Sequence, residues 1–525
     1  MTPATPIRRA TPNDRVPVPW PAAALAGLAA GAAALGIAEL VAGLLPGAAS
    51  PVIAIGDAII ALQPPGAKQF VVDLFGEADK VILVTFIAMV ALGVSAALGA
   101  LARRRPGAAQ LGFTTFGLAY LAAGLRDPLA DPLPTLIAVA AAVTVAVLVL
   151  GWLLRMLRRM VDPPVSMPAW GRRRFLGTSV GIMAAALGSG VAGRVLLAQA
   201  RAGAVAQAAA LPAPATTAPP IPDGARLSGV EGLTPLVTPN ERFYRIDTAL
   251  LTPRPRLATW RLRVHGLVDA PFELTYDELA ALPIHEQYVT IACVSNEVGG
   301  TLVGNALWGG VRLRELLDRA RVRPEGTQIV GRSVDNFTAG FPLAWALAAD
   351  REPLVALTMN GDPLPPDHGF PARLIVPGLF GYVSATKWLS DIELTTWEGF
   401  NGYWVPLGWA KEGPILTQSR IDVPRPFATL AAGPTPIAGV AWAPDRGISA
   451  VEVRVDDGEW QPAELSTPIS DATWVQWVVR WEATEGEHRI RVRATDGAGE
   501  IQTDERTPPA PDGARGHHII EVTVT

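Results

Sequence analysis

The single cysteine of the chain, Cys293, ends a β-branched run, Val289–Cys293, and a polar, glycine-rich turn, Val294–Gly300, follows it directly. The run predicts a buried strand, which delivers a thiol to the strand's end beside a loop that a large ligand can approach closely. The alternative is a buried cysteine that serves as a small hydrophobic residue. One cysteine excludes an intramolecular disulfide, a cysteine-based zinc site, an iron–sulfur cluster with several cysteine ligands and a covalent c-type haem.

Three further segments carry polar residues that suit a large anionic ligand: Thr238–Arg245, Gly331–Phe337 and Asp367–Trp388. The last holds His368, Arg373 and Lys387 among glycines, and its donors and backbone N–H groups can surround a phosphate or a polar heterocycle. Thiolate is a soft ligand for transition metals, and nearby positive charges lower the pKa of a cysteine. With Cys293, these residues favour an anionic ligand that bears a metal. The alternative is that His368 and Arg373 are structural hydrogen-bond donors under a loop.

These segments resemble, in the same order, the molybdopterin-binding domain of the sulfite oxidase family. The resemblance rests on Thr238-Pro-Asn-Glu-x-Phe243, on the Cys293-x-x-Asn296 loop and on the long run from His368-Gly-Phe-Pro-x-Arg373 through Val-Pro-Gly to Lys387-Trp388. It extends from about Thr238 to Pro424, and the remaining C-terminal part resembles the family's immunoglobulin-like dimerisation domain. The apolar N-terminal part lies outside the resemblance.

The resemblance implies a molybdenum–molybdopterin cofactor whose metal is bound by the thiolate of Cys293, which makes Cys293 both the metal ligand and a catalytic residue. Asn240, Phe243 and Tyr244 match the first pterin-contacting segment, and Ser333 and Asp335 match a middle contact. His368 and Arg373 match positions that bind the pterin phosphate and ring, and Ser384 and Lys387 match the loop that closes over the cofactor. Tyr403 matches the active-site tyrosine near the metal, the second residue expected to be catalytic.

The sequence departs from the family where the substrate is expected. Animal and plant sulfite oxidases have an Arg and then a His soon after the Asn-Glu-x-Phe segment, where this chain has Ile246 and Thr248, although Arg245 lies one residue earlier. After the cysteine loop, Glu297 and Val298 replace Arg residues. Fewer cations and an added carboxylate weaken the binding of a dianion by on the order of a few kcal/mol at low effective dielectric. We therefore do not expect sulfite to be the physiological substrate.

Three functions follow as hypotheses. The first is an oxidoreductase of sulfite oxidase type that transfers an oxygen atom to or from a small substrate and exchanges two electrons with a separate carrier, either a haem protein or a quinone system. The second is a periplasmic sulfoxide reductase of the same family. The third, from a different class, is a non-catalytic membrane receptor or scaffold. The net charge of −4 and the lack of a basic stripe interleaved with aromatic residues exclude nucleic acid as an expected partner.

The N-terminal part predicts a membrane domain, because half of the 525 residues are hydrophobic and the mean hydropathy is +0.28. Four apolar runs approach the roughly 20 residues that a helix needs to cross a bilayer: Trp20–Leu45, Lys80–Ala102, Ala108–Leu125 and Leu133–Leu154. Val52–Leu62 is too short to span and is expected at the outer interface. Glu39, inside the first run, either has a function or faces a polar neighbour. None of the six histidines lies in these runs, so we expect no intrinsic haem.

The basic residues predict the orientation of these helices. Three segments are rich in arginine: the one before the first run (Arg8, Arg9, Arg15), the one between the second and third (Arg103, Arg104, Arg105) and the one after the fourth (Arg155, Arg158, Arg159). The other two loops hold only Lys68 and Arg126. The positive-inside rule then places these three segments in the cytoplasm. We expect a multi-pass protein of the cell membrane with its catalytic domain on the extracytoplasmic side.

A basic segment, Gly171–Gly177, precedes a moderately apolar run that continues to Ala198. Its paired arginines resemble a twin-arginine export signal, and the alternative is a fifth membrane-spanning helix with a basic cytoplasmic flank. Ala204-Val205-Ala206 would permit cleavage. An Ala/Pro/Thr linker, Leu211–Pro222, follows.

The expected fold class is multidomain: transmembrane α-helices, then an α+β sulfite-oxidase-like domain, then an all-β immunoglobulin-like sandwich, through which we expect a homodimer. The predicted parts are a cytoplasmic tail (1–19), a four-helix membrane domain (20–160), a fifth helix or export signal (171–200), a linker (201–222), the cofactor domain (223–426) and the sandwich (427–525).

Overall fold

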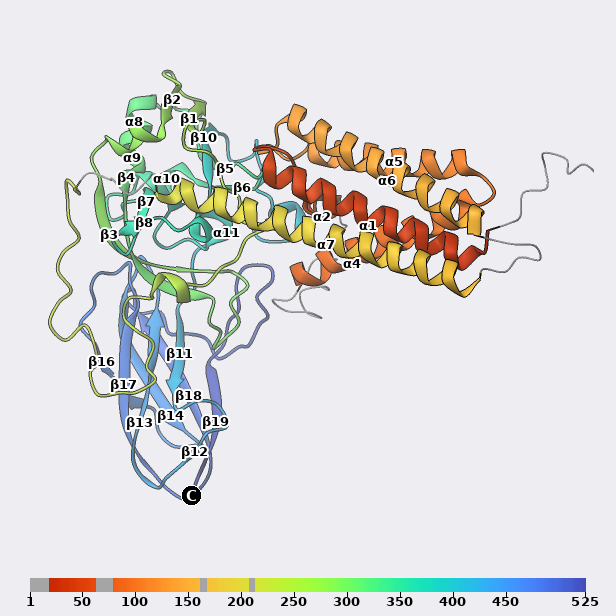
Figure 1. Ribbon diagram of the computed structural model, residues 1–525. Helices are drawn as coiled ribbons and strands as arrows, with labels where there is room; N and C mark the ends of the chain where they lie inside the picture. Colours follow the sequence, from red (N-terminus) through yellow and green to blue (C-terminus); the bar gives the residue numbers. More distant parts are fainter. Residues whose placement is uncertain (1–17, 63–78, 161–167, 207–212) are drawn as a thin grey trace, which may run out of the picture. The chain divides into compact units, whose positions relative to one another are not determined.

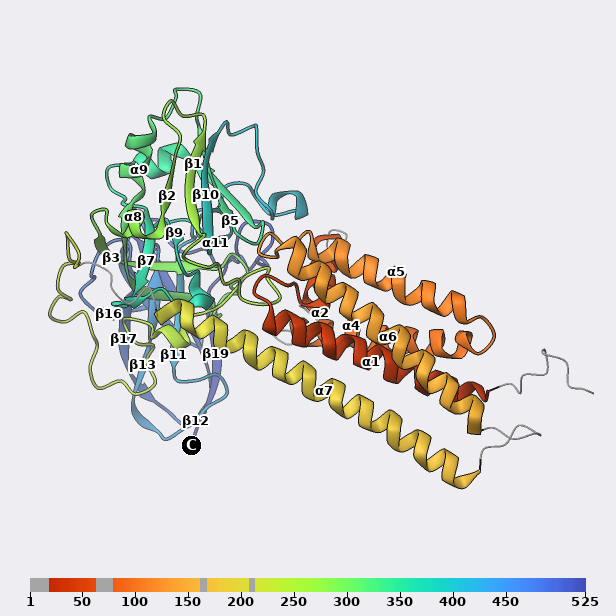
Figure 2. The same ribbon diagram turned by 45° about the horizontal axis from the view of Figure 1, so that its top comes forward.

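The computed structural model describes residues 18–62, 79–160, 168–206 and 213–525, and the chain divides into two compact units, Met1–Ala202 and Gly203–Thr525 (Figures 1 and 2). Four of the basic residues that define the predicted orientation, Arg8, Arg9, Arg15 and Lys68, lie outside the described residues. The helices of the first unit are α1 (Trp20–Leu44), α2 (Pro51–Leu62), α4 (Asp79–Ala102), α5 (Pro106–Gly124), α6 (Pro132–Met160) and α7 (Ala169–Ala206).

Small residues let the long helices approach closely. A Cβ on Gly27 of α1 would lie 2.7 Å from the Cα of Gly99 on α4, and one on Gly31 would lie 2.4 Å from the Cβ of Ser95, so α1 and α4 run antiparallel. Close approach through Gly and Ser is the usual way in which helices associate in a bilayer, where apolar surface alone gives little driving force. The backbones of α1 and α4 are therefore in direct contact.

Four helices in the described part of the chain are long and apolar enough to cross a membrane: α1 over Trp20–Leu44, α4 over Lys80–Ala102, α6 over Pro132–Met160 and α7 over Trp170–Leu197. The predicted third span, Ala108–Leu125, forms α5 but is not among them. Its 19 residues include Gln110, Thr114 and Thr115, which lower its mean hydropathy. The region Gly171–Ala198, for which an export signal and a fifth span were both open, lies within one 38-residue helix.

Helix α7 packs along α1 in parallel. A Cβ on Gly36 of α1 would meet the backbone of Ala186 of α7, and a Cβ on Gly43 would meet the backbone of Gly193. The second contact is seven residues further along both helices, so the two helices run in the same direction. Between these contacts the carboxylate of Glu39 accepts hydrogen bonds from Nε and Nη2 of Arg194, each 3.1 Å long, and one of 2.7 Å from the hydroxyl of Ser50. Glu39, which the sequence left between two explanations, therefore has polar neighbours, and its ion pair ties α7 to α1.

Removal of one partner of this ion pair should destabilise the helical unit. Glu39→Gln leaves Arg194 without its carboxylate in an apolar surrounding, and we expect a loss of about 1–3 kcal/mol, between the values for surface and buried pairs because Arg194 is 38% exposed. Thermal unfolding of the full-length protein in detergent measures the loss. Exchange of the two residues, Glu39→Arg with Arg194→Glu, should restore part of it, and equal stability of all three proteins would contradict the role of the pair.

The second unit begins with a mixed α+β region that contains two sheets. One has the order β2-β1-β10-β5-β6, with β1 parallel to β10 and the other pairs antiparallel: β2 (Phe272–Thr275), β1 (Arg261–Gly266), β10 (Leu389–Thr395), β5 (Gln328–Ser333) and β6 (Thr338–Pro342). The other has the order β3-β4-β7-β8, with β9 also paired to β7: β3 (His285–Ala292), β4 (Val303–Arg312), β7 (Leu354–Met359), β8 (Asp362–Pro363) and β9 (Arg373–Ile375).

Short helices and turns connect these strands at their ends. They are α8 (Tyr276–Ala280), α9 (Leu313–Ala320), α10 (Leu343–Leu347) and α11 (Gly381–Ser384), with 3₁₀ turns at Asn240–Arg242, Pro366–His368 and Val405–Leu407. The predicted linker (201–222) begins too early, because residues 201–206 still belong to α7. Residues 213–222 form no helix, and this segment joins the edge of β3: the amide of Ala215 donates to the carbonyl of Ile284, and Thr216 bridges to His285.

The C-terminal region is a two-sheet sandwich, drawn in blue in Figure 1. Its sheets have the orders β11-β13-β17-β16 and β12-β19-β18-β14-β15. The strands are β11 (Gln418–Val423), β12 (Thr429–Leu430), β13 (Gly433–Trp442), β14 (Ile448–Val455), β15 (Gln461–Pro462), β16 (Glu464–Leu465), β17 (Val475–Ala483), β18 (Gly486–Asp496) and β19 (His518–Val524). A shared core, which includes Ile437, Trp477, Val453 and Ile490, fills the space between the sheets. The predicted succession of helices, α+β domain and all-β sandwich is confirmed, although β11 ends before the predicted boundary at residue 427 and yet belongs to the sandwich.

Candidate active site

Cys293 lies directly after β3, as the sequence predicted, and its side chain is largely buried at 8% exposure. A closed turn follows it: its amide donates to the carbonyl of Leu302, the amide of Asn296 donates to the carbonyl of Cys293, and the side-chain oxygen of Asn296 accepts from the amide of Leu302. Strand β3 is held from its other edge, since the amide of Thr290 donates to the carbonyl of Ala472 at the base of the sandwich. The thiol is therefore fixed by backbone on both sides.

Aromatic rings build one wall near the thiol. Phe243 stacks on Tyr244 at 5.2 Å and meets Trp308 and His368 edge-on at 5.7 and 5.6 Å. The ring of Phe243 occupies the space over Gly304, where a Cβ would come within 2.7 Å of it. Burial and then the charge of Cys293 raise the pKa of Tyr244, whereas the charge of Arg373 lowers it. Tyr244 therefore lies within electrostatic reach of both Cys293 and Arg373.

His368 and Arg373 are both buried, at 5% exposure each. His368 donates from Nε2 to the carbonyl of Asn240 at 2.9 Å, which leaves Nδ1 as an acceptor in the neutral ring. Burial lowers the pKa of His368 to about 4, so the ring is neutral near pH 7. Burial also lowers the pKa of Arg373 to about 10, which leaves the guanidinium charged.

The guanidinium of Arg373 is only partly satisfied by the protein. Its Nη1 donates to the carbonyl of His368 at 3.0 Å, and its carbon lies 5.0 Å from the ring centre of Trp308. Its Nε is buried and has no hydrogen-bond partner among the described residues. A buried donor of this kind costs free energy unless a ligand accepts its hydrogen bond.

Lys387 is the second buried cation. Its Nζ donates to the carboxylate of Asp247 at 3.0 Å and to the carbonyl of Asp367 at 3.1 Å. Burial lowers the pKa of Lys387 to about 8, against the opposing effect of Asp247. Lys387 and Arg373 flank Gly369, where a Cβ would lie 3.0 Å from the Cβ of Lys387 and 3.1 Å from that of Arg373.

Ser333, Asp335 and Tyr403 form a second group. The hydroxyl of Ser333 accepts from the amide of Asp335, and the carboxylate of Asp335 accepts from the amide of Phe337. Tyr403 lies 5.8 Å from Phe337 between ring centres. Burial raises the pKa of Asp335, and Asp247 adds to the rise; burial and then Asp335 raise the pKa of Tyr403. Asp247 thus acts on Lys387 and on Asp335, and so on both groups.

Asn240 and Ser384 have protein partners for their side chains. The amide of Asn240 bonds to the turn after β7, donating to the carbonyl of Met359 and accepting from the side chain of Asn360 at 2.8 Å. The hydroxyl of Ser384 donates to the carbonyl of Phe380 at 3.0 Å. Their assignment as cofactor contacts stays a prediction. Their observed roles are to hold the loop that carries Phe243 and the turn that leads to Lys387.

The sequence did not point to Asp247 or Trp308. Asp247 stands between Ile246 and Thr248 without a motif, and its partner Lys387 is 140 residues away. Trp308 is the fully buried neighbour of Phe243 and Arg373. A signal for Asp247 existed in its flanks, because a carboxylate beside Arg245 in a loop that faces a cation-rich segment predicts an ion pair.

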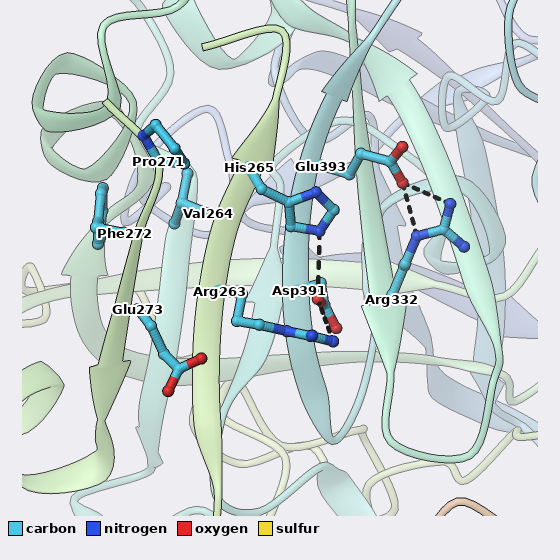
Figure 3. Close-up of a pocket in the computed structure, with 9 residues that line it drawn as sticks. All are labelled: Arg263, Val264, His265, Pro271, Phe272, Glu273, Arg332, Asp391 and Glu393. Atoms are coloured by element: carbon cyan, nitrogen blue, oxygen red, sulfur yellow. Dashed lines mark hydrogen bonds and ion pairs between the residues drawn. The ribbon is translucent and has the colours of Figure 1, made fainter. Parts of the chain in front are cut away.

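The sheet β2-β1-β10-β5 has a concavity of about 700 Å³ on its open face (Figure 3). Figure 3 shows most of its charged side chains paired with one another: Arg263 and His265 contact Asp391 at 2.7 and 3.3 Å, and Arg332 contacts Glu393 at 2.7 Å. Glu273 pairs instead with Arg261, outside the concavity, at 3.6 Å. None of the predicted site residues lines it. We therefore regard this concavity as a self-neutralised sheet surface, and the region of Cys293 remains the candidate active site.

The residues around Cys293 fit a large anionic cofactor. A thiol, two buried cations and a buried Nε–H without a protein acceptor are the donor set that a phosphate-bearing, metal-binding ligand requires. No cluster of three or more His, Cys, Asp or Glu side chains that could hold a metal occurs in the part of the chain that the structure describes. A metal here would therefore be held largely by its own cofactor, with Cys293 as the thiolate available from the protein.

The comparisons with known proteins agree with this arrangement. Residues 249–404 match the family model described as the oxidoreductase molybdopterin binding domain. The uncharacterized oxidoreductase YuiH of Bacillus subtilis is 35% identical over 164 residues, which cover 31% of this chain and 79% of that protein. Mouse mitochondrial sulfite oxidase is 31% identical over 324 residues. The chain belongs to the sulfite oxidase family of molybdopterin-dependent oxidoreductases.

The match to mouse sulfite oxidase covers 52% of this chain and 58% of the relative, so this chain spans little more than half the length of that enzyme. Among solved structures, the sulfane dehydrogenase SoxCD of Paracoccus pantotrophus covers 51% of this chain and 75% of its own, with 24% identity and a TM-score of 0.47. As a member of the sulfite oxidase family, the chain carries the domain that binds the molybdenum cofactor. This favours the enzyme over the receptor or scaffold.

Cys293→Ser should abolish most activity and leave the fold intact. Serine keeps the size of the side chain, but a hydroxyl is a hard and weakly acidic group, so the metal would lose its protein thiolate; we expect turnover to fall by about 100-fold or more. Steady-state turnover and near-ultraviolet circular dichroism of the full-length protein test this. Ser295→Ala, two residues on in the same turn, is the matched control, and unchanged turnover in Cys293→Ser would refute the assignment.

His368 should make stability depend on pH below neutrality. Its pKa in the folded protein, about 4, lies below the ordinary 6.5, so between these values the unfolded chain binds a proton that the folded chain does not. Stability should fall as the pH drops from 6.5 to 4, by up to about 1.4 kcal/mol per pH unit from this group. His368→Gln should flatten that part of the thermal unfolding profile. His488→Gln should not, because Asp456 raises the pKa of His488.

Proposed function

We propose that the protein is a membrane-anchored oxidoreductase whose catalytic domain faces the extracytoplasmic side. It transfers an oxygen atom to or from a small substrate and exchanges two electrons with a separate carrier. The observation that carries the proposal is the convergence of Cys293, Arg373, Lys387 and a neutral His368 in one buried region of the α+β domain. The molybdenum cofactor, when bound, supplies the oxygen-atom and two-electron chemistry.

The chain's own residues bind and orient that cofactor. Cys293 provides a thiolate as the protein's soft ligand for the metal. Arg373 offers its free Nε–H and Lys387 its ammonium to anionic oxygens, while the rings of Phe243 and Trp308 exclude water from the same side. His368, held by the carbonyl of Asn240, presents Nδ1 as an acceptor for a ring N–H. Tyr403 and Asp335 are proposed to lie toward the substrate.

Helix directions support the membrane arrangement. The helices α1 and α4 run antiparallel, and α1 and α7 run parallel. Alternation along α1, α4, α5, α6 and α7 brings three basic groups to one end of the bundle: Arg103–Arg105 after α4, Arg158–Arg159 at the end of α6 and Arg172–Arg174 at the start of α7. By the positive-inside rule this end is cytoplasmic, so α7 exits on the outer side as a fifth helix that carries the catalytic unit.

The bundle offers a place for a lipid-soluble carrier. An apolar cavity of about 210 Å³ lies between α1, α2, α4, α5 and α6, and its wall includes Phe86, Phe113, Phe116 and Tyr120. An apolar cavity of about 150 Å³ is large enough to bind benzene. A quinone, with a six-membered ring on an isoprenoid chain, fits this size and this lining, and it is the carrier that we propose in preference to a haem protein.

Filling the cavity should lower turnover that depends on the quinone carrier and leave turnover with an artificial electron donor or acceptor unchanged. Ala142→Phe, in the cavity wall, should lower turnover with a quinone or quinol by about 10-fold or more, because a phenyl group takes the volume of the ring. Turnover with ferricyanide or a reduced dye should persist. Ala140→Phe, exposed on the same helix, is the matched control. If Ala142→Phe keeps its quinone-dependent turnover, the cavity is not the quinone site, and a parent protein without any quinone-dependent turnover would make a haem protein the carrier.

The direction of the reaction is decided by two assays on the purified full-length protein: sulfite oxidation with ferricyanide, and methionine sulfoxide reduction with a reduced dye. Activity in either assay that Cys293→Ser abolishes supports the proposed function. A molybdenum-loaded protein without activity in either, and toward other S- and N-oxides, would overturn it.

A further inference from the structure

Asp247 is a buried carboxylate between two cations. Its side chain is only 3% exposed, and it accepts from Nζ of Lys387 at 3.0 Å and from Nε of Arg245 at 3.0 Å. A carboxylate out of water persists only where charged partners offset its lost hydration. Arg245 lies on the same loop, two residues before Asp247, and the residues directly beside Asp247, Ile246 and Thr248, are uncharged.

Further charged groups lie around Asp247 and its two cations. Arg245 also contacts Asp367 at 3.2 Å, and Arg254 lies within electrostatic reach of both Asp367 and Arg245. Asp335 is close enough for Asp247 to act on it, and Arg373 is close enough to act on Lys387. Asp247 is the carboxylate in direct contact with both Lys387 and Arg245, so it offsets the positive charge of these two side chains.

We propose that Asp247 is a specificity-determining residue: by neutralising Lys387 and Arg245, it removes the positive field that a dianion such as sulfite would need, so the site takes an uncharged small substrate. This inference rests on the proposed function and narrows its substrate class. Without the carboxylate, the charges of Lys387 and Arg245 would no longer be offset by Asp247, and at low effective dielectric each charge acts strongly on a dianion. An uncharged substrate experiences almost no change.

Asp247→Asn keeps the shape of the side chain and removes its charge. The test uses the full-length holoprotein and two readouts: the Kd for sulfate, measured by isothermal titration calorimetry, and kcat/KM for sulfite and for dimethyl sulfoxide. We expect sulfate to bind roughly 10-fold tighter and kcat/KM for sulfite to rise by a similar factor, with kcat/KM for dimethyl sulfoxide unchanged. Molybdenum and pterin content should equal those of the parent protein.

Two further variants keep the outcome decisive. Asp247→Asn with Arg245→Gln restores the balance of charge and should return the sulfate Kd to that of the parent, which also covers the case in which the single variant is unstable. Glu393→Gln removes a paired carboxylate on the far sheet surface and should change neither readout. An unchanged sulfate Kd in Asp247→Asn, an equal effect on dimethyl sulfoxide, or a loss of pterin would each overturn the inference. A parent protein without molybdenum would instead refute the proposed function.

Discussion

The cost of burying Arg373 and Lys387 is the constraint on which the rest of the site depends. A guanidinium and an ammonium out of water are tolerated only with anionic or strongly polar partners. Asp247 meets that need for Lys387, whereas Arg373 has one carbonyl, the face of Trp308 and a free Nε–H. The α+β domain thus contains a positive charge that the protein only partly satisfies, which a phosphate-bearing cofactor would complete, and in the proposed function the nearby thiol of Cys293 is the protein ligand of that cofactor's metal.

The scaffold explains why these side chains do not relax onto one another. Strand β3 fixes the position of Cys293. It pairs with β4 on one edge, and on the other edge the amide of Thr290 donates to the carbonyl of Ala472. Arg373 begins β9, paired to β7, so its backbone cannot shift toward Asp247. His368 is held by the carbonyl of Asn240 from a segment more than a hundred residues earlier. Strands fix the thiol and the guanidinium, and loops bring the other groups to them.

Local patterns predicted what lies within one segment. The β-branched run Val289–Cys293 predicted a strand that ends at the thiol, and β3 ends at Ala292, directly before Cys293. Side-chain pairs between distant segments carried no such signal: Asp247 with Lys387, and Glu39 with Arg194, are visible only in space. For the same reason α7 could not be distinguished from an export signal, because its packing on α1 depends on Gly36 and Gly193 facing each other's helix.

The most direct test is the molybdenum and pterin content of the full-length protein made in a host that synthesises the cofactor, compared with Arg373→Gln. A glutamine cannot supply the buried positive charge, so the variant should lose most of its pterin while Glu393→Gln, on the other sheet face, keeps it. Stoichiometric molybdenum and pterin in the parent, lost in Arg373→Gln, is the predicted result. A parent protein that contains neither, or an Arg373→Gln variant that is fully loaded, would contradict the account.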